Sequence, residues 1–295
     1  MSKSLQEQTL SSFTEKWSNN KDLAFSETLR EGSSIQKWIL QRNGFESLTQ
    51  FKEWLAHRDH ILDAGCGNGR VTALLKANSS EEHKIVGIDL SSAEIASKNL
   101  SNLSNVEIHK KDLLGDLSDL GSFDLIYCQE VLHHTSDPLA SFSNLCNLLK
   151  PSGEIAIYVY KKKAPIREYA DDYIRSLVSD LSYEEASKEM SQLTELGKSL
   201  SNLKVKIKVP EIKSLDIKCG EYDVQRFIYH YFLKCFWNPE LSEIENTAVN
   251  FDWYHPSIST RHTPDEVRSW FNVNSLKIIH FHEDHYGITA RGTLS

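Results

Sequence analysis

Residues 61–70 read I-L-D-A-G-C-G-N-G-R, and they are the strongest indication of the fold in this sequence. A short apolar run reaches Asp63, three glycines then alternate with other residues, and an apolar-periodic segment begins directly after them. This order predicts a β-strand, a tight glycine turn and a helix. Glycine allows sharp turns and close approach of the backbone to a ligand, so we expect the turn to bind a cofactor.

Two classes of cofactor use such a turn. A dinucleotide requires the spacing G-x-G-x-x-G, so that its pyrophosphate lies on the helix N-terminus. Here the spacing is G-x-G-x-G, Arg70 occupies the last position of that frame, and Asp63 would repel a pyrophosphate. A carboxylate there favours a cationic cofactor without phosphate. A strand–helix turn with incidental glycines is the alternative.

Two further acids follow the next two apolar runs. Asp89 ends the run I-V-G-I-D, where a carboxylate can accept hydrogen bonds from both hydroxyls of a ribose. Asp112 follows the next run, where a carboxylate could accept from an adenine amino group. The fourth run leads into Q-E-V-L-H-H-T-S-D-P at residues 129–138, and L-L-K-P-S-G at 148–153 precedes the fifth.

This series of motifs resembles the class I S-adenosylmethionine-dependent methyltransferases over residues 59–160 and the closing strand pair. The resemblance implies an α/β, doubly wound, Rossmann-like fold with a mostly parallel seven-stranded sheet whose last strand is antiparallel. It also implies S-adenosylmethionine as the cofactor. The turn before the fifth strand has Ser152 where the family usually has a second glycine, but that turn touches no chemistry.

The resemblance assigns the parts of the cofactor to residues of this chain. Asp63 and the glycines serve the methionine part, Asp89 the ribose and Asp112 the adenine, while Gln129 lies beside the sulfonium. The full set of implied cofactor-binding residues is Asp63, Gly65, Cys66, Gly67, Asp89, Leu90, Asp112, Leu113 and Gln129.

Patterning along the chain predicts four segments. Residues 1–58 form an N-terminal helical cap, and residues 59–160 form the cofactor-binding core, with a short helix near 113–119. A mainly helical insertion spans residues 161–260, with helices expected at 164–180, 183–202 and 221–236 and a strand at 204–209. A capped helix from Thr263 and two strands, 276–281 and 286–290, close the core within residues 261–295.

The candidate general bases follow the fourth strand, because open α/β sheets bind ligands at the carboxyl ends of their strands. His134 is the first candidate and His133 the second, since an imidazole with a pKa of about 6.5 suits proton removal at neutral pH. The alternative is that both histidines only shape the wall of the site. We expect Glu130 to cap or orient the loop.

We expect the insertion to bind and recognise the methyl acceptor, because insertions at this point form a lid in the resembling family. Arg167 and Arg261 could clamp a carboxylate or phosphate, although Arg167 could instead form an exposed ion pair with Asp171. The candidate acceptor-binding residues are Tyr160, Arg167, Tyr254, His255 and Arg261. Near the N-terminus, Phe13 and Trp17 share a helical face that either closes over the cofactor or serves ordinary packing.

Composition narrows the class of protein. The 295 residues carry 33 Lys and Arg against 41 Asp and Glu, a net charge of -8, which weighs against nucleic-acid binding. Five scattered cysteines predict a reducing compartment. Without a signal-like segment or a long apolar run, we expect a cytoplasmic protein that does not enter membranes. His280, His282 and His285 invite a zinc site, but their place in a closing hairpin favours no metal.

These observations together predict a methyltransferase acting on an oxygen or nitrogen nucleophile of a small-molecule, saccharide or lipid-precursor acceptor. An RNA- or tRNA-modifying methyltransferase is the first alternative, kept open by the lysines at 161–163 and the basic stretch 204–208. A non-catalytic regulator that binds S-adenosylmethionine is the second, and an NAD-dependent oxidoreductase is more distant.

Overall fold

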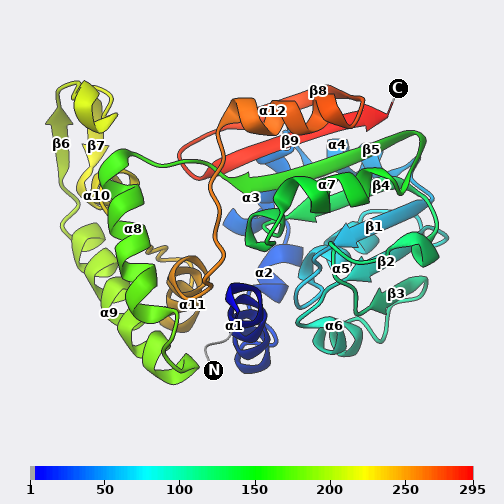
Figure 1. Ribbon diagram of the computed structural model, residues 1–295, viewed down its shortest axis with the longest axis horizontal. Helices are drawn as coiled ribbons and strands as arrows, with labels where there is room; N and C mark the ends of the chain where they lie inside the picture. Colours follow the sequence, from blue (N-terminus) through cyan, green and yellow to red (C-terminus); the bar gives the residue numbers. More distant parts are fainter. Residues whose placement is uncertain (1–3, 295) are drawn as a thin grey trace. The chain divides into compact units, whose positions relative to one another are not determined.

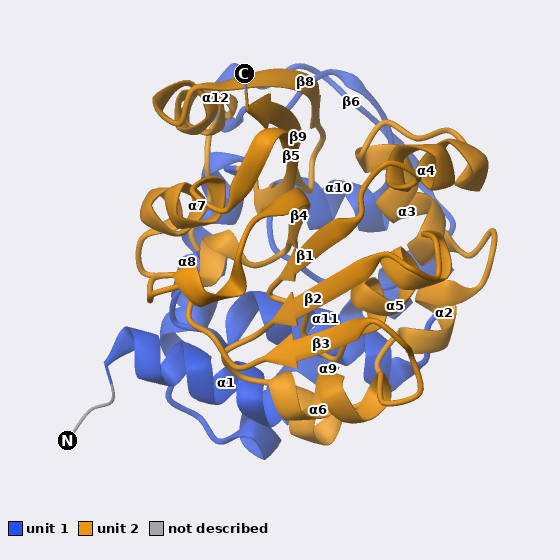
Figure 2. Cartoon of the chain, turned by 90° about the vertical axis from the view of Figure 1, so that its right-hand side faces the viewer, with its two compact units in different colours: residues 1–16, 162–259 blue, residues 17–161, 260–295 orange. Residues whose placement is uncertain are grey.

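The computed structural model describes residues 4–294, which form two compact units. The core unit runs from Trp17 to Lys161 and from Thr260 onward, and the inserted unit joins the described residues up to Lys16 to Lys162–Ser259 (Figure 2). The first turns of the chain thus group with the inserted region and not with the rest of residues 1–58. The roles of cap and lid stay predictions.

A seven-stranded sheet with the order β3-β2-β1-β4-β5-β9-β8 forms the centre of the core unit (Figure 1). Strands β1 to β5 are parallel, and β9 runs antiparallel to both of its neighbours, as the family resemblance implies. The strands are β1 (His60–Ala64), β2 (Lys84–Ile88), β3 (Val106–His109), β4 (Phe123–Gln129), β5 (Leu149–Tyr160), β8 (Leu276–Glu283) and β9 (Gly287–Leu294).

Helices cover both faces of this sheet, as a buried parallel sheet requires. Leu62 and Ile126 pack on one face with residues of α7 (Pro138–Cys146) and α12 (Pro264–Val273). Ile61 and Leu125 pack on the other with residues of α3 (Ser34–Arg42), α4 (Leu48–Leu55) and α5 (Arg70–Ala77). The other helices that reach or lie in this unit are α1 (Leu5–Asn19), α2 (Phe25–Leu29) and α6 (Ala93–Asn99).

Local capping explains where the core helices begin. Asp137 accepts a hydrogen bond from the Ala140 amide at the start of α7, and Thr263 forms the predicted capping box with Glu266 at the start of α12. Only a one-turn 3₁₀ helix, η1 (Ser118–Leu120), overlaps the helix expected near 113–119, whose first residues form a turn instead. There the Asp112 carboxylate accepts from the Leu114 amide, and this turn competes with a helix.

The inserted unit is mainly helical. The predicted helices at 164–180 and 183–202 are confirmed as α8 (Pro165–Val178) and α9 (Tyr183–Asn202), and the predicted strand as β6 (Lys206–Val209). The helix expected at 221–236 is wrong at both ends. Its first residues form β7 (Gly220–Asp223), which pairs with β6, and only Val224–Tyr231 are helical, as α10, after the Asp223 cap. A last helix, α11 (Glu243–Tyr254), completes the unit.

Hydrogen bonds tie the start of α1 into the inserted unit. The Gln8 amide donates to the carbonyls of Ser179 and His255, and the Lys16 ammonium lies 2.7 Å from the Asp252 carboxylate. None of the helices between residues 4 and 294 is long and apolar enough to cross a membrane.

Candidate functional site

The glycine turn between β1 and α5 has the backbone that its sequence predicts. Gly65, Gly67 and Gly69 have φ of +82°, +58° and +88°, in the left-handed region that favours glycine. A Cβ at Gly65 would lie 2.2 Å from Val131 Cγ2, and a Cβ at Gly67 would lie 2.9 Å from Trp17 Cζ2. The turn is therefore closely packed, and side chains there would clash.

Asp63 lies beneath this turn and is fully buried on β1. The Thr72 hydroxyl of α5 donates a hydrogen bond of 2.6 Å to its Oδ2. Burial raises the pKa of Asp63 to about 7, with the nearby Asp89 carboxylate adding to the effect. A buried carboxyl in this state gains a favourable partner when a cation arrives.

Asp89, at the carboxyl end of β2, faces the glycine turn. Its Oδ2 accepts a hydrogen bond of 3.0 Å from the Gly67 amide, and its Oδ1 accepts from the amides of Ser91 and Ser92. The second predicted acid, Asp112, follows β3 and accepts from the Leu114 amide at 2.9 Å. The carboxylates of Asp63, Asp89 and Asp112 thus come from β1 and from the ends of β2 and β3.

The remaining implied cofactor residues differ in what they can offer. Cys66 is buried in the turn, and burial raises the pKa of its thiol, which keeps it neutral. Leu90 is half-buried. Leu113 packs in the core beside α7, and its carbonyl accepts a hydrogen bond from the Asn144 side chain. Its side chain therefore serves the core.

The segment before α3 lies against the glycine turn. The side-chain amide of Asn68 donates from Nδ2 to the carbonyls of Lys21 and Leu23, and Arg70 Nη1 donates to the Thr28 hydroxyl at 3.0 Å. Together with Trp17 beside Gly67, these contacts support the reading in which the end of α1 borders the cofactor position.

Gln129, at the carboxyl end of β4, is held by a chain of hydrogen bonds. Asn43 Nδ2 donates to the Ile39 carbonyl and to the Tyr127 hydroxyl, and that hydroxyl donates to Gln129 Oε1. Gln129 Nε2 is buried, and it has no hydrogen-bond partner among residues 4–294. A buried donor in this state calls for a ligand or an ordered water.

Glu130 follows with a positive φ of 61°, unusual for a residue with a side chain. Its carboxylate lies 3.7 Å from the Arg70 guanidinium, which connects the loop after β4 to the start of α5. Strained backbone of this kind is concentrated at ligand sites. The arrangement agrees with the expectation that Glu130 orients the loop.

The two candidate bases occupy the 3₁₀ helix η2 (Leu132–His134) and differ in setting. His133 is fully buried, its ring stacks on Tyr160 at 3.6 Å, and its Nδ1 accepts a hydrogen bond from the Tyr160 amide. His134 is only half-buried and meets the Tyr160 ring edge-on at 5.5 Å. The geometry favours His134 as the base, and both assignments stay predictions.

The predicted acceptor-binding residues are divided between the two units. Tyr160 lies with the histidines at the end of β5, and the half-buried Arg261 also belongs to the core unit. Arg167, Tyr254 and His255 belong to the inserted unit and are buried there. His255 stacks on Phe251, with one ring nitrogen 2.7 Å from the Ser12 hydroxyl and the other 3.1 Å from the Leu181 carbonyl.

The interpretation of Arg167 and Asp171 as an exposed pair is wrong, because both side chains are fully buried. Asp171 accepts from Arg167 Nε at 3.1 Å, from Trp253 Nε1 at 2.7 Å and from the Tyr254 hydroxyl at 2.7 Å. Arg167 also donates to the Tyr229 carbonyl. These bonds give Arg167 and Tyr254 a packing role inside the inserted unit; their predicted contact with an acceptor stays a prediction.

The histidines of the closing hairpin have other contacts. The ring of His280 donates from Nε2 to the Arg42 carbonyl, and His282 lies 3.8 Å from Asp284. Among the described residues, no group of three or more His, Cys, Asp or Glu side chains is placed to hold a metal ion.

Sequence and structure comparisons identify relatives. Residues 56–202 match the family described as a methyltransferase domain. The chain is 26% identical over 187 residues to a ubiquinone biosynthesis O-methyltransferase of Coxiella burnetii, covering 60% of this chain and 76% of the relative. The chain belongs to the class I S-adenosylmethionine-dependent methyltransferases.

Two other comparisons set the limits of this assignment. A Synechococcus protein of unknown role is 39% identical over 118 residues, but the match covers 38% of this chain and only 28% of that relative. A magnesium protoporphyrin IX methyltransferase of Synechocystis PCC 6803, solved with bound S-adenosylmethionine, has the same fold at a TM-score of 0.50 and 11% identity, with 100% and 99% coverage.

The site fits the family's cofactor, S-adenosylmethionine. The three glycines in the left-handed region allow the tight turn after β1, and the buried carboxyl of Asp63 suits a cation better than a pyrophosphate. Sequence reasoning did not find Trp17 beside Gly67 as a definite contact, nor the link from Asn43 through Tyr127 to Gln129. Alternation on β4 could have shown that Tyr127 and Gln129 share a face, but not that Asn43 joins them.

Proposed function

We propose that this protein transfers the methyl group of S-adenosylmethionine to an oxygen or nitrogen atom of a small-molecule acceptor, a class that includes saccharide and lipid precursors. The observation that carries the proposal is the buried carboxyl of Asp63 next to the glycine turn, in which the Gly67 amide donates a hydrogen bond to Asp89. The relative named as a ubiquinone biosynthesis O-methyltransferase supports a small acceptor.

The bound cofactor supplies an electrophilic methyl group on a sulfonium. The chain's own residues must orient the acceptor in line with that group, exclude water and take up the proton that the acceptor loses. We assign the proton to His134, the half-buried imidazole at the end of η2. Gln129 and Glu130 stand at the start of the same loop, where their side chains contact Tyr127 and Arg70.

Incubation of the purified protein with methyl-labelled S-adenosylmethionine and fractionated cell extract tests this function. We expect the label in the small-molecule fraction, on a compound that gains one methyl group. Label in the RNA fraction would instead identify an RNA methyltransferase. Absence of label from every fraction, in protein that binds the cofactor, would contradict catalysis and support a regulator.

A further inference from the structure

Arg42, the last residue of α3, lies in an unusual setting within the core unit. It is 4% exposed, and its guanidinium carbon lies over the rings of Trp38 at 4.4 Å, Tyr158 at 4.6 Å and Tyr286 at 5.5 Å. Its Nη2 donates to the Asp284 carboxylate at 2.8 Å. The guanidinium is therefore a buried charge inside an aromatic enclosure.

The other two guanidinium nitrogens of Arg42 have no hydrogen-bond acceptor among residues 4–294. Arg42 Nε and Nη1 are buried, and neither has a hydrogen-bond partner in the part of the chain that the structure describes. Gln129 Nε2 is in the same condition. Burying an N–H donor without an acceptor costs free energy, most of all on a charged group. A ligand atom that accepts a hydrogen bond from these donors would recover that free energy.

These donors belong to one neighbourhood. Gln129 and Tyr158 are paired in register on β4 and β5, and the Tyr158 ring packs against Arg42. The orientation of the Gln129 amide is fixed, because the Ile39 carbonyl can only accept and so directs each later hydrogen bond through Asn43 and Tyr127. Its Oε1 is used, and its Nε2 is the group presented.

The position of these donors indicates which ligand they would contact, the methyl acceptor or the cofactor. Asp63, Asp89 and Asp112 belong to the half of the sheet that β1, β2 and β3 form. The rings around Arg42 lie on α3, β5 and the turn after β8, on the other side of the point where strand order reverses. Ligands of open α/β sheets bind across that point. A guanidinium would also repel the sulfonium of the cofactor. The ligand that Arg42 would contact is therefore the methyl acceptor.

We propose that Arg42 and Gln129 bind an oxyanion, a carboxylate or a phosphate, of the methyl acceptor. The acceptor is then an acid that carries its nucleophilic oxygen or nitrogen elsewhere, and the guanidinium fixes its orientation. The turn with Asp284 and Tyr286 covers Arg42, so it must give way as the anion enters. This inference rests on the proposed function and names its substrate class.

A second arginine provides a matched control. Arg291 on β9 also lies over two rings, Phe45 at 4.6 Å and Trp54 at 5.4 Å, and it faces Glu154 at 3.5 Å. It is paired with Ala156 on β5 and His280 on β8, partway along β9 (Gly287–Leu294) and away from the turn that precedes it. Arg291 Nε and Nη1 are also buried without a hydrogen-bond partner among residues 4–294. A ligand at the carboxyl ends of the strands does not reach that position, so Arg291 reports the effect of losing a stacked arginine with the same unpaired donors away from the site.

Binding of three probes, benzoate, phenyl phosphate and benzamide, tests the proposal by titration calorimetry with and without S-adenosylhomocysteine. We expect at least one anion to bind the unaltered protein and benzamide to bind far more weakly. Arg42→Gln should weaken the anion at least about tenfold, the loss expected for one charge-assisted contact. Arg42→Lys should weaken it less, and Arg291→Lys should change it less than about twofold. Stronger binding of benzoate or of phenyl phosphate identifies the oxyanion.

Equal anion binding by the unaltered protein and Arg42→Gln would overturn the proposal, and so would failure of both anions to bind. Thermal melting shows whether each variant is folded, and Arg42→Lys keeps the test valid if Arg42→Gln is not. Binding of S-adenosylhomocysteine is read separately. Its loss from the unaltered protein would contradict the proposed function, whereas its retention with no anion binding would contradict this inference alone.

Discussion

Asp63 is the residue whose chemistry the fold changes most. Burial raises its pKa to about 7, from an unfolded value of 3.8. Between these values the folded protein holds a proton that the unfolded chain releases. This group therefore lowers the free energy of unfolding as pH rises through that window, and the whole penalty is present above the folded pKa. A bound cation offsets it by favouring the ionised form.

From this follows a pH dependence of cofactor binding. The Kd for S-adenosylmethionine should fall as pH rises from about 6 to about 8, because the cation displaces the Asp63 proton. Calorimetry in two buffers of different ionisation enthalpy measures the proton released. Asp63→Asn should bind more weakly and lose this part of the slope, and an unchanged slope in that variant would show that another group titrates.

A pair of single substitutions separates cofactor binding from chemistry. Asp89→Ala removes the acceptor for the Gly67 amide and should weaken S-adenosylmethionine binding at least about tenfold. His134→Ala should leave that Kd nearly unchanged and slow methyl transfer, since imidazole acts on the acceptor's proton. Calorimetry and a labelled-methyl assay report the two effects. Similar losses of binding in both variants would remove His134 as the base.

The sequence predicted those site residues whose spacing along the chain forms a recognisable motif. Asp63, Asp89 and the glycines follow from motif spacing and strand ends. Gln129 was predicted beside the sulfonium, but its orientation depends on Asn43, far from it in sequence. Arg42 and Asp284 pair across nearly the whole chain. Contacts of that kind leave no local pattern, so sequence reasoning missed Arg42.

Among the elements, the turn after β1 packs directly on the loop after β4. Gly65→Ala would place its Cβ 2.2 Å from Val131 Cγ2 at a φ of +82°, so we expect loss of cofactor binding and about 1–3 kcal/mol of stability. Gly121→Ala is the control, because its φ is +81° with nothing within 4 Å of the added Cβ. Urea unfolding compares the two variants. Equal losses would show that the contact with Val131 contributes nothing, and adding Val131→Ala should recover part of the difference.

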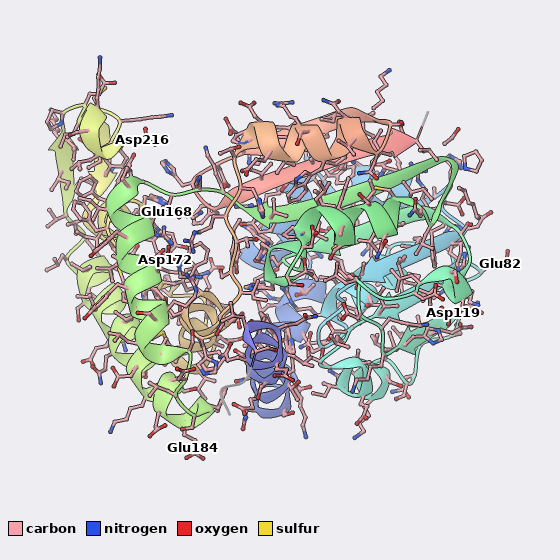
Figure 3. All side chains as sticks on the ribbon, viewed as in Figure 1. Glu82, Asp119, Glu168, Asp172, Glu184 and Asp216 are labelled. Carbon is pink, nitrogen blue, oxygen red and sulfur yellow. The ribbon has the colours of Figure 1, made fainter. Side chains whose placement is uncertain are left out.

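Within the inserted unit, α8 carries two neighbouring acids with opposite settings. Asp171→Asn should destabilise this unit by about 3–5 kcal/mol, because the Arg167 charge then stays buried without its partner. Asp172, labelled on α8 in Figure 3, is 58% exposed and pairs with Arg175. Asp172→Asn should cost less than about 1 kcal/mol. Urea unfolding decides, and comparable losses would contradict a structural role for the buried pair.

Elements with their own caps and periodicity were predicted well, as α9 and α12 show. The prediction for residues 221–236 was wrong because β7 exists only as the partner of β6. Pairing of strands is a tertiary effect that can override helical spacing. The prediction of a helix near 113–119 failed at its first residues for a local reason, because Asp112 forms a turn with the Leu114 amide.

On the scale of the whole molecule, the division into two units was only partly predictable. The insertion after β5 is visible in sequence because the alternation of strands and helices stops there. The attachment of α1 to the inserted unit depends on Gln8 and Lys16, which bond to residues more than 160 positions later. Periodicity predicts that α1 is a helix, and it does not identify the unit to which the helix belongs.

We predict that the core unit binds a sulfonium cofactor and not a dinucleotide. Titration calorimetry of the full chain with S-adenosylhomocysteine and, separately, with NADH tests it most directly. We predict saturable one-to-one binding of S-adenosylhomocysteine, weakened in Asp89→Ala, and no binding heat from NADH. Saturable heat from NADH, with none from S-adenosylhomocysteine, would contradict the claim.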